Sequence, residues 1–164
     1  MEFIKLMTSS LIFILPAYCA NAAPVIFGGG KPLDQGKLFL DGKPLFGNHK
    51  TVRGTISGLL FGILTAAILY YLLNYDFKVG VALSIGTLVG DLSGSFIKRR
   101  LNFPPGKPFP ILDQLTFVLF AIGFAYLVSP IKIEVIITVL LLTPIIHVLT
   151  NLFAYIFGFK KVPW

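Results

Sequence analysis

Five long apolar runs decide which folds are open to this chain. A helix needs roughly 20 apolar residues to cross the hydrocarbon core of a bilayer. Only 13% of the 164 residues are charged and 55% are hydrophobic, whereas about 25% of the residues in soluble domains are charged. We therefore predict an all-α integral membrane protein that forms one domain over residues 1–164. Its five transmembrane helices should cover about Phe3–Ala23, Thr55–Tyr75, Val79–Ile97, Ile111–Val128 and Ile133–Phe157.

The positive charges are divided unevenly between the segments that connect these runs. With the N-terminus outside, only Lys5, Lys78 and Lys132 of the 14 lysines and arginines lie outside. Cytosolic loops of membrane proteins carry the excess of lysine and arginine. The pattern therefore predicts an external N-terminus and a cytosolic C-terminus. The net charge of +7 then reflects membrane orientation, and we expect no nucleic-acid partner.

The first apolar run could also be read as a cleaved signal peptide, because Ala20-Asn21-Ala22 resembles a cleavage site. Cleavage would export the segment Pro24–Gly54 with its five cations, against the same charge rule. We therefore expect the first helix to be retained.

Two cytosolic segments, about residues 24–54 and 98–110, hold most of the polar residues, and we expect both to be ordered. In the first, Asp41-Gly42 between apolar residues predicts a two-residue hairpin, with Pro44 restricting its strand to an edge. In the second, four prolines favour an extended chain. The single Cys19 excludes a disulfide framework, and no Cys and His spacing suggests zinc.

The first segment also contains candidate phosphate-binding residues. Lys50 and Arg53 come immediately before a predicted helix, and backbone amides at a helix start attract phosphate. The spacing of the glycines and Lys50 is not that of a P-loop. Gly28-Gly29-Gly30 is either a turn that holds a nucleotide or a flexible exit from the first helix.

Glycines recur every four residues in two of the predicted helices. They are Gly54, Gly58 and Gly62 in one helix and Gly86, Gly90 and Gly94 in another. Such spacing lets helix backbones approach closely in lipid. It fits packing within one chain as well as packing in a dimer, so the oligomeric state is not predicted.

A cluster of acids and cations surrounds the second cytosolic segment. Asp91, Ser95 and Lys98 fall on one face of a helix, with Arg99 close by, and Asp113 opens the next helix. Carboxylates beside cations suit a magnesium-bound nucleoside triphosphate, because Mg²⁺ takes one or two carboxylates together with phosphate oxygens. Each feature also has a simpler interpretation. Lys98-Arg99-Arg100 could be an orientation signal, Asp113 a helix cap, and Asp91 an ion-pair partner of Lys98 or Arg99.

Two stretches of the chain resemble one enzyme family. "GDLSGSFIKRRLNFPPGKPFPILDQL" and "PVIFGGGKPLDQGKLFLDGKPLFGNHKTVRG" are similar to the archaeal CDP-archaeol synthases. The first also resembles the signature of the phosphatidate cytidylyltransferases, through Asp91, Ser95, Lys98-Arg99 and Leu112-Asp113-Gln114. The resemblance implies a membrane-bound, Mg²⁺-dependent nucleotidyltransferase of phospholipid biosynthesis. Its reaction would join CTP to 2,3-di-O-geranylgeranylglyceryl phosphate, giving the CDP-lipid and pyrophosphate on the cytoplasmic side of the cell membrane.

The resemblance also suggests roles for individual residues. We assign Asp91, Asp113 and Lys98 as catalytic residues. The two acids would bind Mg²⁺, and Lys98 would bind a phosphate group. The candidate substrate-binding residues are Lys50, Arg53, Ser95, Arg99, Gly29, Gly30, Asn48 and Gln114. Thr116 and Asn48 stand where relatives often have acids, which bears on the number of metal ions.

Other functions remain open from the sequence. The apolar helices would equally accept another lipid phosphate, such as diacylglycerol phosphate. A small transporter could use Asp91 and His147 as intramembrane relays, and a membrane scaffold would need only the glycines. His147 itself predicts either a hydrogen bond between helices or a place in the reaction cavity.

Overall fold

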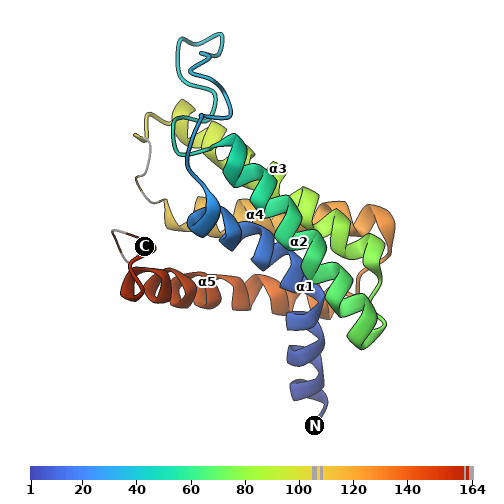
Figure 1. Cartoon of the computed structure of the whole chain (residues 1–164). Helices are drawn as coiled ribbons and strands as arrows, with labels where there is room; N and C mark the ends of the chain where they lie inside the picture. Colours follow the sequence, from blue (N-terminus) through green and yellow to red (C-terminus); the bar gives the residue numbers. More distant parts are fainter. Residues whose placement is uncertain (105–106, 108, 161, 163–164) are drawn as a thin grey trace.

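The computed structural model describes residues 1–104, 107, 109–160 and 162, which form an all-helical bundle (Figure 1). Residues 105, 106 and 108 of the predicted second segment lie outside the described residues, as does Lys161 of the predicted cytosolic charges. The helices of the described part are α1 (Glu2–Phe27), α2 (Val52–Leu73), α3 (Phe77–Arg100), α4 (Pro110–Val128) and α5 (Ile133–Ile156).

The prediction of five helices is confirmed, and each helix overlaps one apolar run. In the described residues, α1, α2, α3 and α5 are long and apolar enough to cross a membrane. α4 contributes a shorter apolar helix, Leu112–Val128. That α4 also spans the bilayer therefore stays a prediction.

Local signals set the ends of these helices beyond the apolar runs. Thr51 caps α2, accepting a 3.0 Å hydrogen bond from the backbone N–H of Gly54. Asn74 ends α2 in the left-handed conformation, and Asp76 starts α3 by accepting from the N–H of Lys78. Pro110 occupies the first turn of α4, where no N–H is needed.

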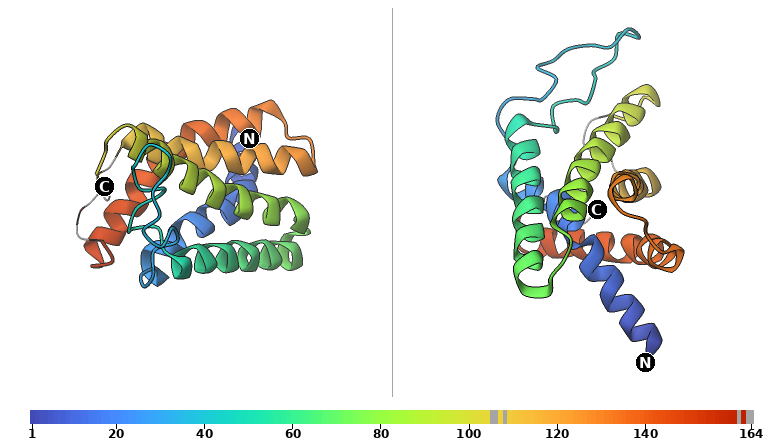
Figure 2. Two further views of the ribbon diagram at one scale, coloured as in Figure 1. Left: turned by 90° about the horizontal axis from the view of Figure 1, so that it is seen from above. Right: turned by 90° about the vertical axis from the view of Figure 1, so that its right-hand side faces the viewer.

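α3 lies between α2 and α4, and α5 packs on α1 and α4 (Figures 1 and 2). The shared core is apolar and contains the fully buried side chains of Ile14, Leu83, Val118 and Val139, with Phe117 almost completely buried. The N-terminal end of α1 extends away from the other helices (Figure 1).

Both glycine series serve packing within the chain. A Cβ placed on Gly90 would lie 2.6 Å from the Thr116 carbonyl oxygen and 2.7 Å from the Cα of Phe117. α3 and α4 therefore approach backbone to backbone, as the four-residue spacing predicts. In α2, Gly58 and Gly62 give the same close approach to Ala20 of α1 and to side chains of α3.

The predicted hairpin at Asp41-Gly42 is present as a turn, with less pairing than expected. Phe39 N–H donates to the Lys43 carbonyl at 2.8 Å, so the loop contains three residues and not two. Only one isolated bridge follows, between Leu38 and Pro44. Pro44 has no N–H to continue the ladder, which explains why no strand forms.

Candidate active site

An ion pair joins Lys50 of the first connecting segment to Asp91 of α3. The Nζ of Lys50 lies 2.6 Å from both carboxylate oxygens of Asp91. The backbone fixes Lys50, because its carbonyl accepts from Leu33 N–H and the next residue, Thr51, caps α2. The ion-pair interpretation of Asp91 therefore holds with a different partner from the ones expected, Lys98 or Arg99.

A second ion pair joins Lys98 of α3 to Asp113 of α4. The Nζ of Lys98 lies 2.9 and 3.0 Å from the two oxygens of Asp113, and Lys98 is buried. Asp113 also accepts a 2.9 Å hydrogen bond from the backbone N–H of Phe109, just before the helix. The cap interpretation and the site interpretation of Asp113 are therefore compatible.

The residue after Lys98 is a buried guanidinium with spare donors. Arg99 is 6% exposed, and its Nη2 donates to the carbonyl of Pro104 at 3.3 Å. Its Nε and Nη1 make no hydrogen bond in the described part of the chain. Buried donors are usually satisfied, so these two are available to an anionic ligand, and the role of Arg99 in binding phosphate stays a prediction.

The third consecutive cation, Arg100, holds the hairpin of the first segment. It donates to both carboxylate oxygens of Asp41, and its guanidinium lies 4.0 Å from the ring centroid of Phe96. In return, the Nζ of Lys43 donates to the Arg100 carbonyl at 2.9 Å. The hydrogen bond from Arg100 lowers the pKa of Asp41 to about 2. We call this pair the Asp41–Arg100 latch.

Asp34 organises the first segment from inside. Its buried carboxylate accepts hydrogen bonds from the N–H groups of Gly36, Phe46 and Gly47 at 2.9–3.1 Å. Burial raises the pKa of Asp34, but these donors outweigh it, so the net pKa lies below the usual value. Sequence reasoning missed both Asp34 and the latch. An Asp two residues before a glycine is a turn signal that could have indicated Asp34.

The remaining predicted substrate residues fall into two groups. Gly29, Gly30 and Arg53 line a cavity of about 550 Å³ together with Lys31, and neither Asp91 nor Asp113 is in its lining. The other three lie elsewhere: Asn48 is exposed, and Ser95 and Gln114 are half-buried. The structure thus pairs Lys50 with Asp91 and Lys98 with Asp113. Gly29, Gly30 and Arg53 line a cavity that does not include either acid.

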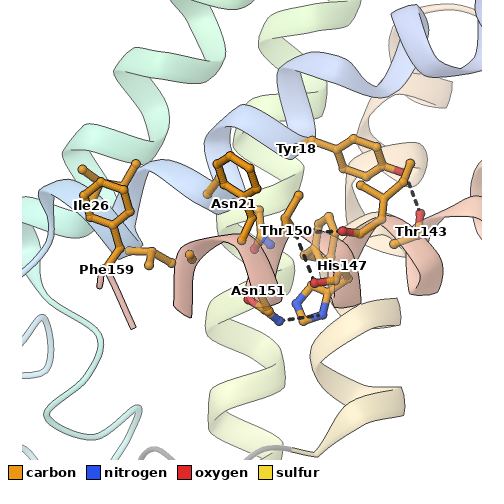
Figure 3. A pocket seen from close by; sticks show the side chains of 14 residues that line it. Tyr18, Asn21, Ile26, Thr143, His147, Thr150, Asn151 and Phe159 are labelled. Carbon is orange, nitrogen blue, oxygen red and sulfur yellow. Dashed lines mark hydrogen bonds between the residues drawn. The ribbon is translucent and has the colours of Figure 1, made fainter. Parts of the chain in front are cut away.

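A second cavity, of about 240 Å³, lies between α1 and α5 (Figure 3). His147 is in its lining, together with Asn151 of the next helical turn. Its hydrogen bond, 3.1 Å to Asn151, lies within α5. Beside this cavity, a hydrogen bond of 2.9 Å between the hydroxyl groups of Tyr18 and Thr143 joins α1 to α5. In the described part of the chain, His147 therefore lines this cavity and shows no hydrogen bond from its side chain to another helix.

Comparisons with known proteins decide the family. A family model described as "CarS-like: CDP-archaeol synthase" matches residues 3–164. The chain belongs to the CDP-archaeol synthase family. The resemblance seen in the two polar segments is confirmed, and the transporter and scaffold hypotheses give way to an enzyme.

Individual CDP-archaeol synthases are similar along almost the whole chain. The protein of that name from Methanocaldococcus jannaschii is 48% identical, with 99% of both chains covered. The one from Pyrococcus horikoshii is 49% identical, covering 93% of this chain and 94% of its own. A solved structure of an intramembrane enzyme for archaeal membrane lipids biosynthesis matches with a TM-score of 0.82, at 32% identity, covering 88% of this chain and 94% of that one.

The donor set of this CDP-archaeol synthase family member fits a magnesium ion that arrives with its nucleotide. No group of three or more His, Cys, Asp or Glu side chains that could hold a metal occurs among the described residues. Mg²⁺ at phosphate-transfer sites needs only one or two carboxylates, because phosphate oxygens and waters complete its shell. Asp91 and Asp113 carry carboxylates of this kind, with side chains 31% and 30% exposed, and their role as Mg²⁺ ligands stays a prediction.

Proposed function

We propose that this chain transfers the cytidylyl group of CTP to 2,3-di-O-geranylgeranylglyceryl phosphate. The products are CDP-archaeol, in its unsaturated form, and pyrophosphate. The observation that carries the proposal is the family match over residues 3–164. The stretch Gly90–Leu115, on which the resemblance was first seen, contains three of the four residues of the two lysine–carboxylate pairs.

The reaction needs no strong general base. The second pKa of a phosphate monoester is near 6, so the lipid phosphate is mostly dianionic at neutral pH. One of its oxygens can attack the α-phosphorus of CTP directly. The bond from that phosphorus to the bridging oxygen breaks, and pyrophosphate leaves with the electron pair. The protein has to position the reactants and neutralise their charge.

The two lysine–carboxylate pairs supply that neutralisation. Lys50 and Lys98 are each held by one carboxylate in the structure. When a triphosphate enters, we expect both ammonium groups to turn toward its oxygens, since phosphate carries more charge than a carboxylate. The Nε and Nη1 of Arg99 have no partner among the described residues, so Arg99 would hold a phosphate without having to break an existing ion pair.

Asp91 and Asp113 would hold Mg²⁺ once their lysines bind phosphate. The ion supplies charge neutralisation on the triphosphate, which makes pyrophosphate a better leaving group. Ser95, half-buried on the same helix as Asp91, would orient that carboxylate or bond a phosphate oxygen.

We further propose that the site faces the cytoplasm at the surface of the cell membrane. The start of α2, the end of α3 and the start of α4 lie at one end of the bundle (Figure 1). The described residues of the two predicted cytosolic segments, about 24–54 and 98–110, are at this end, and they hold nine of the 14 lysines and arginines. That distribution is the one that keeps loops in the cytosol.

The decisive assay uses the purified chain in detergent with CTP, Mg²⁺ and the geranylgeranyl lipid phosphate. We expect a CDP-lipid and pyrophosphate in equal amounts, and no product with ATP. A parallel reaction with diacylglycerol phosphate tests the alternative acceptor. Thermal unfolding adds an independent readout, because a ligand at 100 times its Kd stabilises a protein by about 2.7 kcal/mol. No turnover together with no protection by CTP would contradict the proposal.

A further inference from the structure

The chain reverses at the end of α5 and brings a lysine back toward the helix bundle. Gly158 adopts the left-handed conformation, with φ of 75°. The N–H groups of Phe159 and Lys160 then both donate to the Ala154 carbonyl, at 2.8 and 3.1 Å. This is the glycine-terminated helix end that satisfies the last carbonyls. The turn directs the side chain of Lys160 inward, toward Asn151 of α5.

Lys160 begins a chain of polar contacts that runs along α5. Its Nζ donates to the Oδ1 of Asn151 at 3.0 Å, and Nδ2 of Asn151 lies 3.1 Å from Nδ1 of His147. Burial lowers the pKa of Lys160, and the carboxylate of Asp113 opposes this by raising it. Lys160 therefore lies within electrostatic reach of a carboxylate of the candidate active site.

Part of this series of polar residues lies on the cavity between α1 and α5 (Figure 3). Asn151 and His147 are in its lining, while the rest of the wall is largely apolar, with Val25, Ile26 and Phe153 among its residues. An apolar cavity with a polar wall suits an amphiphile whose head is anionic. The cavity lies between helices that are both apolar enough to cross a membrane, so a lipid chain can reach it.

We propose that Lys160, with Asn151 and His147, binds the phosphate of the lipid substrate, and that the α1–α5 cavity holds part of one isoprenoid chain. This rests on the proposed function and adds a location for its second substrate. Lys50 and Lys98 would then serve mainly the triphosphate, and the lipid phosphate would approach from the α5 side. The ammonium of Lys160 and the amide of Asn151 supply donors to the phosphate oxygens.

The first test separates lipid binding from nucleotide binding. Lys160→Gln should raise the KM for the lipid phosphate about tenfold, since a charge-assisted hydrogen bond is lost. It should leave the KM for CTP and the thermal protection by CTP unchanged. Lys160→Arg should recover much of the lipid affinity. An unchanged lipid KM in Lys160→Gln, in an enzyme that is otherwise active, would overturn the proposal. Absence of wild-type turnover would instead contradict the proposed function.

The second test examines the cavity. Ala22 lines it from α1, and Ala22→Phe should fill it without touching the turn at Gly158. We expect kcat/KM for the geranylgeranyl lipid to fall at least about tenfold, and less for a short-chain analogue with the same glycerol phosphate. Val148→Phe is the control, because Val148 is exposed on α5 and outside the cavity lining. Equal losses with both lipids, or equal effects of both variants, would overturn the cavity assignment.

Discussion

Arg100 binds Asp41 through two hydrogen bonds of 2.9 and 3.0 Å, joining positions 59 residues apart in the chain. The pair fastens the hairpin of the first connecting segment to the end of α3. Lys50 belongs to the same segment and pairs with Asp91 of the same helix. The position of Lys50 in the candidate site is therefore supported by a contact made outside it.

Loss of this latch should loosen the segment and weaken nucleotide binding. In Arg100→Gln we expect faster proteolysis within residues 28–51 and a higher KM for CTP. The proteolysis rate and the KM for CTP of Arg100→Lys should lie between those of the wild type and Arg100→Gln. Lysine keeps the charge but cannot form the paired hydrogen bonds or stack on Phe96. Lys107→Gln is the control, since it removes the same charge from an exposed residue. Equal proteolysis of the Arg100 and Lys107 variants would show that the latch does not hold the segment.

The latch should persist into strongly acidic solution. The pKa of Asp41 in the folded protein, about 2, lies below the ordinary aspartate value of 3.8 because Arg100 donates hydrogen bonds to the carboxylate. A carboxyl group with a depressed folded pKa contributes stability above its unfolded pKa and loses it as pH falls through the folded pKa. The contribution of Asp41 should therefore be complete above about pH 4 and disappear toward pH 2. Carboxyl NMR of Asp41 checks this directly, and a midpoint near 4 would contradict it.

Removal of either acid should abolish turnover and leave the protein folded. Asp91→Asn and Asp113→Asn retain the side-chain volume and lose the charge that Mg²⁺ requires. Asp113→Asn should also lower the Tm more than Asp91→Asn. Its partner Lys98 has a side chain only 10% exposed, against 26% for Lys50, and an unpaired buried charge is costly. Turnover assays and thermal unfolding in detergent measure the two effects. Near-normal turnover in either variant would exclude that residue from the site.

Close packing at α3 should tolerate no added methyl group. In Gly90→Ala the new Cβ would meet backbone atoms of α4 at 2.6 and 2.7 Å, and backbone cannot move aside cheaply. We expect a loss of about 1–3 kcal/mol in unfolding free energy. Gly123→Ala is the matched control, because its Cβ would meet no atom within 4 Å. If both variants unfold alike, close packing at Gly90 is not what the glycine provides.

Cysteine labelling can determine the orientation. In a Cys19→Ala background, Asn48→Cys should react with a membrane-impermeant reagent only from the cytosolic side. Asn74→Cys, in the connection between α2 and α3, should react only from outside. Both asparagines are exposed, so differences in reactivity report sidedness. The reverse pattern would invert the proposed topology.

Hydropathy alone predicts the helices well, because an apolar run long enough to cross a bilayer has few other solutions. The observed ends differ by a few residues. α2, for example, begins at Val52 and not near Thr55 because Thr51 caps it. The glycine spacing likewise predicts close packing, although the partner of each series becomes visible only in the bundle.

The pairing of charges could not be predicted in the same way. Asp91 and Lys98 share a helical face, so sequence spacing favours a pair between them. The actual partner of Asp91 lies 41 residues away, brought there by a segment whose path depends on the buried Asp34 and the latch. Lys160 is a similar case, because its inward position depends on the left-handed turn at Gly158.

Lys98, Arg99 and Arg100 follow one another on α3 and bind three separate parts of the chain: Asp113, the Pro104 carbonyl and Asp41. A run of this kind also biases the direction in which a helix inserts. Substitutions that removed these charges to reverse insertion would at the same time break up the site. Under the proposed orientation and site, the same three residues therefore set both the sidedness of α3 in the membrane and the charge arrangement of the active site.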